Sequence, residues 1–258
     1  MEIISNIFSI ILYQPLYNAL IFVYNIIPDL GASIIIITVI IRVILLPLSK
    51  KAIESQKKMQ EIQPELKAIQ EKYKNNAQKK GEEMMKFYKE KKVNPAAGCL
   101  PLVIQIIILI ALYRVFLNAS IHFDNQSNLL YSFISSPELI NPISFGIIDI
   151  TQRSIPLAII SAGLQFWQTK MMMTKQQKQK KSKEEETKEP DFATIMQQQM
   201  LYVAPIMTFV IGLSFPAALP VYWIVTTLFM IGQQYYILHK ENNSNDSKDS
   251  NIIIPEKL

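Results

Sequence analysis

Arg42 is a charged residue inside an apolar run of the chain, residues 30–48. It lies about two-thirds of the way along that run, roughly 9 Å from the end that meets a lysine-rich segment, by helical rise. A central arginine costs roughly 2.5–3.5 kcal/mol in lipid, so such residues usually serve a function. The chemistry open to Arg42 is pairing with a carboxylate in a medium of low dielectric. The alternative is that its guanidinium reaches back to the headgroups.

Other polar residues interrupt the apolar runs, mostly in the half nearer the lysine-rich segments. Polar side chains in hydrocarbon must face one another or water. We therefore expect a hydrated cavity that is open to the cytoplasm, closed on the outside, and lined by Arg42. For any single glutamine, a hydrogen bond between helices remains the alternative. The residues concerned are Thr38, Ser49, Gln105, Ser161, Gln165, Gln168, Thr169, Thr226, Thr227, Gln233 and Gln234.

Five apolar runs are long enough to cross a bilayer as helices, because about 18 residues at 1.5 Å each cover about 27 Å. Lysine and arginine collect between runs one and two, between runs three and four, and after run five, and such residues stay on the cytoplasmic side. The sequence thus predicts an all-α integral membrane protein with its N-terminus outside and its C-terminus inside. The runs are 30–48, 100–117, 155–172, 199–215 and 219–238.

Residues 1–29 form a separate N-terminal segment in this scheme. Pro15 disfavours a helix interior, so we expect two short pieces here. Tyr and Asn among the aliphatics of residues 16–27 suit a helix that lies in the membrane interface. A signal peptide is the alternative, although no basic residue precedes the first run. The insertion core would then be residues 30–239.

Three polar segments leave the membrane in this scheme. Residues 49–97 hold thirteen lysines and an apolar face at helical spacing, which predicts a cytoplasmic helical hairpin with breaks at Pro64, Asn75–Asn76 and Gly81. The hairpin could be a structural cap or a landing surface for a partner. Residues 173–197 are expected to form a solvated cytoplasmic loop, and residues 240–258 a disordered cytoplasmic tail.

Residue types argue against an enzyme. There is one cysteine, Cys99, and the two histidines, His122 and His239, have no metal-ligand spacing. No glycine-rich phosphate loop is present, and no Ser/His/Asp set falls within the apolar runs. We expect no catalytic residue, no metal and no cofactor.

Three stretches resemble the YidC/Oxa/Alb insertases, in the short form without a large extracytoplasmic domain. They are IIRVILLPLSKKAIESQKKMQEIQPELKAIQEKY (40–73), NPAAGCLP (94–101) and FPAALPVYWIVTTLFMIGQQ (215–234). The resemblance implies a five-helix core, a cytoplasmic hairpin, and a groove that is open to cytoplasm and lipid and bears Arg42. It places Thr38 and Gln105 in that groove, and it places substrate contacts at Tyr222 and Trp223. Arg114 departs from the family pattern.

The resulting hypothesis is a membrane protein insertase and chaperone of the bacterial cell membrane that carries out no chemical reaction. Its expected partners are nascent membrane proteins, the lipid bilayer, the ribosome through the basic cytoplasmic loops, and a Sec translocon, with no DNA. Arg42 would pair transiently with acidic substrate residues. The rivals are a small-solute transporter or channel and a purely structural assembly subunit.

Overall fold

The computed structural model describes residues 6–94, 100–120, 129–180 and 192–249, and these residues are mostly helical. The all-α expectation is confirmed for them, apart from one short β-hairpin. In chain order the elements are the π-helical turn η1 (Ser9–Tyr13), α2 (Gln14–Ile26), α3 (Leu30–Ile44), α4 (Leu46–Glu61), α5 (Gln63–Lys72), α6 (Ala77–Glu90), α7 (Leu100–Ser120), β1 (Ile143–Ser144), β2 (Ile148–Asp149), α8 (Ile155–Lys180), α9 (Phe192–Ser214) and α10 (Ala218–Asp249).

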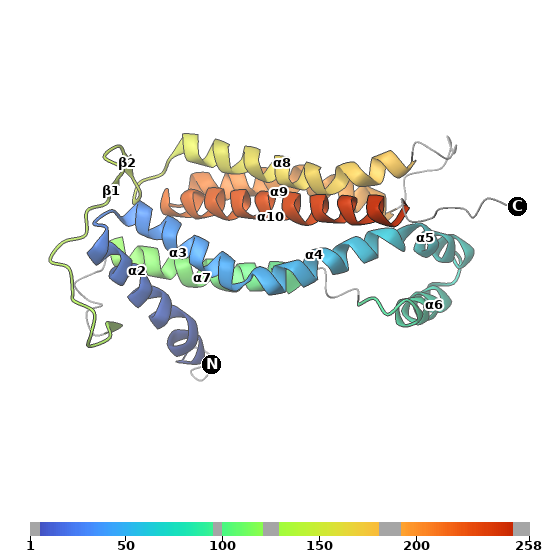
Figure 1. The fold of residues 1–258 in the computed structure, drawn as a ribbon, viewed down its shortest axis with the longest axis horizontal. Helices are drawn as coiled ribbons and strands as arrows, with labels where there is room; N and C mark the ends of the chain where they lie inside the picture. Colours follow the sequence, from blue (N-terminus) through green and yellow to red (C-terminus); the bar gives the residue numbers. More distant parts are fainter. Residues whose placement is uncertain (1–5, 95–99, 121–128, 181–191, 250–258) are drawn as a thin grey trace, which may run out of the picture.

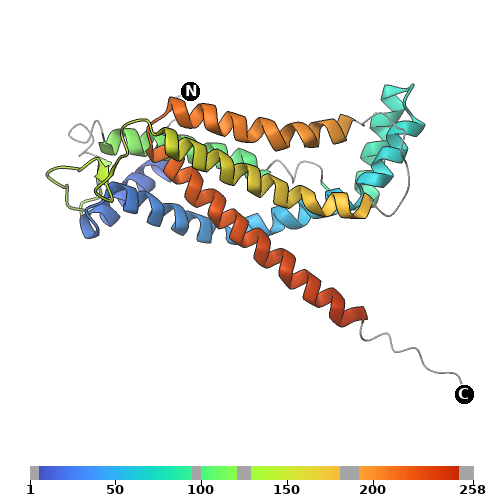
Figure 2. The same ribbon diagram turned by 90° about the horizontal axis from the view of Figure 1, so that it is seen from above.

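The long helices α3, α7, α8, α9 and α10 run side by side along the longest axis of the molecule (Figure 1). Helix α8 packs against α9 and α10, α10 packs against α3, and α2 packs against α3 and α7. Helices α5 and α6 lie beyond one end of this bundle, which we call the hairpin end. The β-hairpin lies beyond the opposite end, the distal end. Helix α10 diverges from its neighbours toward the C-terminus (Figure 2).

The first apolar run is not one straight helix. Helix α3 ends at Ile44, and α4 leaves it at an angle of 60°. Pro47 explains the bend, because its ring clashes with the carbonyl of Val43 and it has no N–H to donate. The helix of the predicted span 30–48 therefore ends two residues after Arg42, and Leu48 belongs to α4.

The N-terminal helix corrects our prediction for Pro15. Residues 6–26 form one continuous helix instead of two pieces. The turn before the proline is π-helical, and the backbone N–H of Gln14 donates to the carbonyl of Ser9, five residues back. This wider turn accommodates the proline without a break. By length and hydropathy the helix Asn6–Ile26 could cross a membrane, as could α3 and the start of α4 taken together.

The predicted hairpin is present as α5 and α6, which pack against each other. Its ends are joined by an ion pair between Lys91 and Glu65, with a nitrogen–oxygen distance of 2.7 Å. The side chain of Asn76 caps α6 by accepting from the backbone N–H of Lys79 at 3.0 Å. Gly81 was expected to break the helix but lies inside α6, with open space around its Cα. The favourable cap and the exposed position make this glycine tolerable.

Two segments that we expected to be irregular are partly helical. Helix α8 continues to Lys180, and α9 begins at Phe192, so both enter the predicted loop 173–197. Helix α10 continues to Asp249, where a disordered tail was expected from residue 240. Lys, Gln and Glu are good helix formers, so an existing helix extends readily into such sequence. Residues 181–191 and 250–258 lie outside the described part of the chain, as do 95–99 of the motif 94–101.

The core lies near the distal end, where α2, α3 and α7 meet. Tyr17, Ile21, Leu30, Ile34 and Val115 are fully buried there. Aliphatic faces on three helices bury one another at this point, which fixes α2 against the bundle and supports the α3 backbone that carries Arg42.

Side chains of α2 hold the loop that precedes β1. Asn18, which is 1% exposed, donates to the carbonyls of Gln14 and Leu129 at 2.8 Å and accepts from the backbone N–H of Tyr131 at 2.7 Å. Tyr24 Oη accepts from the backbone N–H of Asn141 at 2.9 Å. The distal loop is therefore fixed to the helix by its own backbone.

Asp29 fixes the start of α3 to the β-hairpin. One carboxylate oxygen accepts from the backbone N–H of Ala32 at 3.0 Å, as an N-cap does, and the other accepts from that of Phe145 at 2.6 Å. The N–H of Gly31 donates to Ser144 Oγ at 2.6 Å, and a Cβ at position 31 would collide with this hydroxyl. The glycine is needed for this close approach.

Candidate functional site

Arg42 points from the end of α3 into the bundle. Its side chain is 8% exposed, and its Nη2 donates to Oε1 of Gln105 on α7. Among the residues described by the structure, no aspartate or glutamate forms an ion pair with it. A glutamine carbonyl can orient the guanidinium but cannot neutralise its charge. A buried positive charge therefore has only neutral partners.

Gln105 connects Arg42 to the last helix. Its Nε2 donates to the hydroxyl oxygen of Tyr222 on α10 at 2.7 Å. Tyr222 is 1% exposed and packs in the core. One chain of hydrogen bonds thus crosses α3, α7 and α10 and fixes the rotamers of all three side chains.

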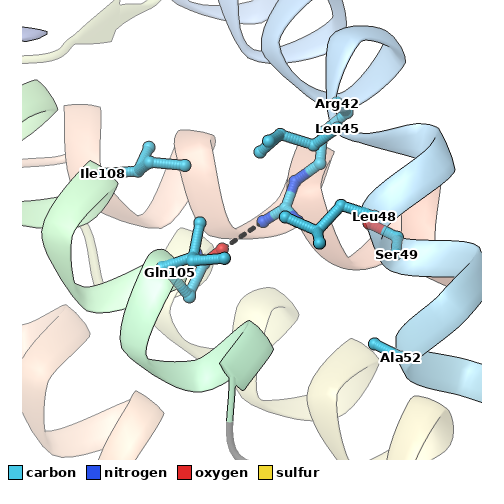
Figure 3. A pocket seen from close by; sticks show the side chains of 8 residues that line it. Arg42, Leu45, Leu48, Ser49, Ala52, Gln105 and Ile108 are labelled. Carbon is cyan, nitrogen blue, oxygen red and sulfur yellow. Dashed lines mark hydrogen bonds between the residues drawn. The ribbon is translucent and has the colours of Figure 1, made fainter. Parts of the chain in front are cut away.

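A small hollow that is open to solvent lies beside the guanidinium, and its cavity volume of about 30 Å³ leaves room for only a few waters. Figure 3 shows the Arg42 side chain reaching toward Gln105 across this space. The pocket combines one charge and two polar side chains with an otherwise aliphatic wall. Its lining residues are Arg42, Leu45, Leu48, Ser49, Ala52, Ile104, Gln105 and Ile108.

Helical spacing could have identified part of this lining. Leu45, Ser49 and Ala52 follow Arg42 by three, seven and ten residues, and these positions share one face of a helix. The 60° bend after Ile44 turns that face toward α7, so the pocket wall bridges the end of α3 and the start of α4. The contact between Gln105 and Tyr222 had no signal in the sequence, because it depends on how three helices pack.

Thr38 and Thr226 are both buried but differ in their hydrogen bonds. Thr38 lies one turn before Arg42, and its hydroxyl donates to the carbonyl of Ile34 at 2.6 Å. The Thr226 hydroxyl, one turn after Tyr222, forms no well-aligned hydrogen bond, although the Tyr222 hydroxyl lies close to it. Trp223 is half-buried against the core. Thr226 therefore keeps buried hydrogen-bonding capacity that Thr38 has already used.

Gln165 and Gln168 lie on α8, outside the hydrogen-bonded chain of Arg42, Gln105 and Tyr222. Gln168 is buried and Gln165 is half-buried. Within the described ranges, neither side chain forms a hydrogen bond to Arg42, Gln105 or Tyr222. Helix α8 packs against α10, so its polar stripe belongs to the α8–α10 side of the bundle. Helix α10 also carries two buried polar atoms that lack partners, Nε2 of Gln233 and Oε1 of Gln234.

This arrangement offers a positive charge and hydrogen-bond donors. In the described part of the chain, no three His, Cys, Asp or Glu side chains are grouped as metal ligands. The guanidinium has five N–H donors, and the hydrogen bond to Gln105 uses one of its nitrogens. The remaining donors suit a planar anionic group, such as a carboxylate, that enters the pocket.

Known proteins resemble this chain over most of its length. The family model described as "60Kd inner membrane protein" matches residues 22–245. The "Membrane protein insertase YidC" of Clostridium perfringens is 33% identical over 91% of this chain and 90% of its own length. That of Fusobacterium nucleatum is 34% identical over 82% and 87%. That of Streptomyces avermitilis is 31% identical over 88% of this chain, which spans 55% of that protein.

Several curated relatives are much longer than this chain. It spans 40% of the insertase of Lawsonia intracellularis, to which it is 34% identical. A solved structure entitled "Active YidC insertase crystal structure with the first transmembrane domain resolved" matches with a TM-score of 0.54 at 23% identity, over 87% of this chain and 46% of that one. This likeness shows that the two share a fold.

Proposed function

The chain belongs to the 60Kd inner membrane protein family, and on that premise we propose that it is a membrane protein insertase and chaperone, with Arg42 at the centre of its substrate groove. It is a multi-pass protein of the bacterial plasma membrane. Relatives of similar length are named membrane protein insertases. The observation that carries the proposal is a buried arginine with neutral partners beside an open pocket.

We propose five membrane crossings, made by α3, α7, α8, α9 and α10, with the hairpin end in the cytoplasm. The basic segments support this orientation, since lysine and arginine remain on the cytoplasmic side. The hairpin and the α8–α9 connection then meet nascent chains as they arrive. Their positive charge would favour contact with ribosomal RNA, and a Sec translocon is a further candidate partner.

The proposed step is a transient ion pair. An acidic residue of an incoming substrate enters the pocket and pairs with Arg42, which lowers the cost of removing its carboxylate from water. Gln105 holds the guanidinium in place through its bond to Tyr222. A resident carboxylate would block this step, because it would neutralise the charge before any substrate arrived.

The apolar segment of the substrate then moves into lipid, and the burial of its apolar surface drives insertion. Trp223 is partly exposed on α10 and can contact that segment. Tyr222 is almost fully buried, so its role in this arrangement is to hold Gln105. This proposal differs from the expectation that both residues contact substrate, because only Trp223 would do so.

The test uses proteoliposomes and two versions of one single-span substrate, with an acidic or a neutral tail. Arg42→Ala should reduce insertion of the acidic version at least tenfold, which corresponds to about 1.4 kcal/mol, and Arg42→Lys should retain part of the activity. The neutral version should change much less. Arg153→Ala, at an exposed arginine outside the pocket, is the matched control.

Two outcomes contradict the proposal. Equal loss for both substrates would mean that Arg42 maintains the structure and does not recognise charge, and full activity of Arg42→Ala would remove the pairing step. Conductance or solute uptake by the same liposomes would favour the alternative hypothesis of a transporter or channel.

A further inference from the structure

The loop between α7 and α8 exposes large apolar side chains. Phe133, Leu139 and Ile147 are 77%, 85% and 83% exposed. Phe145, in the turn of the β-hairpin, is 52% exposed. Single exposed apolar residues are ordinary, but four in one short segment mark an interaction surface. We call these four residues the distal apolar set.

Their exposure does not come from a loose chain. Asn18 and Tyr24 bind the loop backbone at residues 129–131 and 141, and Asn25 donates to the carbonyl of Ser135 at 2.7 Å. Ile134 and Ile150 of the same segment are buried. The loop therefore has a buried side and an apolar outer side, which is the pattern of a surface that meets another apolar phase.

The turn of the β-hairpin has two consecutive residues with positive φ angles, which is an uncommon backbone conformation. Phe145 has φ +55°, and the next residue, Gly146, has φ +70°. A bulky side chain in this left-handed region is unfavourable and persists only where the surroundings enforce it. The bond from the Phe145 N–H to Asp29 enforces it here. The result is a turn that presents Phe145 and Ile147 outward.

Charge and position identify the apolar phase. Between residues 129 and 152 the only charged residues are Glu138 and Asp149, and Asp149 accepts from the Thr151 hydroxyl at 2.6 Å. The loop lies at the distal end, near the starts of α3 and α8 (Figure 1). Adjacent helix ends are also apolar and exposed, at Ile26 and Ile155. The distal apolar set thus continues the apolar surface of helices that stand in a bilayer. Glu138 and the exposed Arg153 flank the set, where they can reach the headgroups.

We propose that the distal apolar set inserts into the lipid of the leaflet at the distal end and anchors this end of the bundle at a fixed depth. The occupant is the boundary between headgroups and acyl chains, where exposed aromatic and aliphatic side chains of peripheral elements settle. Because the loop is fixed to α2 and to the start of α3, the anchor also sets the depth of those helices.

The experiment reads the environment of single fluorophores. Cys99 is replaced by alanine, and an environment-sensitive dye is attached to a cysteine at position 139 or 147 in proteoliposomes of phosphatidylcholine and phosphatidylglycerol. A dye at Glu82 of α6 provides the aqueous reference, and one at Ser136 tests the polar part of the loop. Lipids with a nitroxide near the headgroup end of the acyl chain should quench positions 139 and 147 at least about twofold more than position 82.

Aqueous iodide should show the opposite order, with position 82 quenched most. Iodide quenching at 139 and 147 equal to that at 82 would overturn the proposal, since the set would then stand in water. Protection of both positions from both quenchers would also overturn it, in favour of a protein that covers the loop. Retained circular dichroism and substrate insertion by the labelled variants show that the protein is folded.

Discussion

The distal end and the interior of α10 treat buried polar atoms in opposite ways. At the distal end, Asn18, Asp29 and Ser144 all find partners on another segment. On α10, Thr226, Gln233 and Gln234 each have a buried polar atom without one. The Tyr17 hydroxyl is the exception near the distal end. Satisfied polar groups hold a closed structure together, whereas unsatisfied ones cost free energy unless water or a guest reaches them.

This contrast assigns different tasks to the two regions. At the distal end, hydrogen bonds of Asn18, Asp29 and Ser144 fix α2, α3 and the β-hairpin as one unit, which we call the clasp. The interior between α3, α7 and α10 keeps an unneutralised charge next to a pocket, and α10 carries buried polar atoms without partners. Substitutions in the clasp should therefore change stability, and substitutions in the interior should change insertion.

The largest expected effect is at Asn18. Asn18→Leu leaves the Tyr131 N–H without a partner and weakens the hold on the Leu129 carbonyl, which should lower the free energy of unfolding by about 3 kcal/mol. Thermal unfolding in detergent measures this. Asn25→Ala removes one exposed hydrogen bond and should cost well under half as much. Equal losses for the two variants would show that burial does not decide the strength of the clasp.

The second effect concerns Asp29 and pH. Burial raises the pKa of this carboxyl, but hydrogen bonds from the N–H groups of Phe145 and Ala32 favour its charged form, and the net pKa lies below the ordinary value of 3.8. Because the folded-state pKa is lowered, the charged carboxylate stabilises the protein fully above the ordinary pKa of 3.8. This contribution disappears as pH falls through the folded-state pKa.

Asp29→Ala should therefore cost about 1–2 kcal/mol at neutral pH, and the difference from wild type should shrink progressively below pH 4. Unfolding measured from pH 7 down to pH 3 checks this. Asp29→Asn keeps an N-cap acceptor but does not titrate, so it should lie between the two at neutral pH. A pH-independent difference for Asp29→Ala would contradict the assigned role.

The third effect tests the unpartnered atoms directly. Thr226→Val replaces a buried hydroxyl without a partner, so stability should stay constant or rise by about 1 kcal/mol. Thr38→Val is the matched control, because its hydroxyl donates to Ile34 and its loss should cost up to about 1 kcal/mol. Insertion should fall with Thr226→Val. Destabilisation by Thr226→Val equal to that of Thr38→Val would erase the difference between the two regions.

The smallest effect is at Arg114, whose guanidinium lies 5.6 Å from the centre of the Phe8 ring. The side chain is exposed, so this cation–π contact should contribute about 0.5 kcal/mol between α7 and the N-terminal helix. A double-mutant cycle with Arg114→Gln and Phe8→Leu measures the coupling. A coupling of zero would show that the contact with Phe8 does not stabilise the packing of α7 against the N-terminal helix.

Apolar length and lysine distribution predicted the helices of the bundle and the hairpin, because both depend on local composition. Backbone detail was harder. Pro15 is absorbed by a π-helical turn, Pro47 bends a run that looks uniform in hydropathy, and Gly81 stays helical. Their position as polar residues inside apolar runs predicted that Arg42 and Gln105 line a polar site. Their direct hydrogen bond, and the separation of Gln168 from them, depend on which helix faces pack together. The packing of helix faces cannot be predicted from a single sequence.

The bend after Ile44 gives the pocket an unusual construction, because part of its wall belongs to a lever. Helix α4 has sixteen residues and is about 24 Å long, so a rotation of about 10° at the bend moves its far end by about 4 Å. The pocket residues of α4 lie close to the bend and would move little; they are Leu48, Ser49 and Ala52. Helices α5 and α6 follow the far end of α4 and would move most. Any load on the hairpin is therefore transmitted, at reduced amplitude, to the side chains that face the guanidinium.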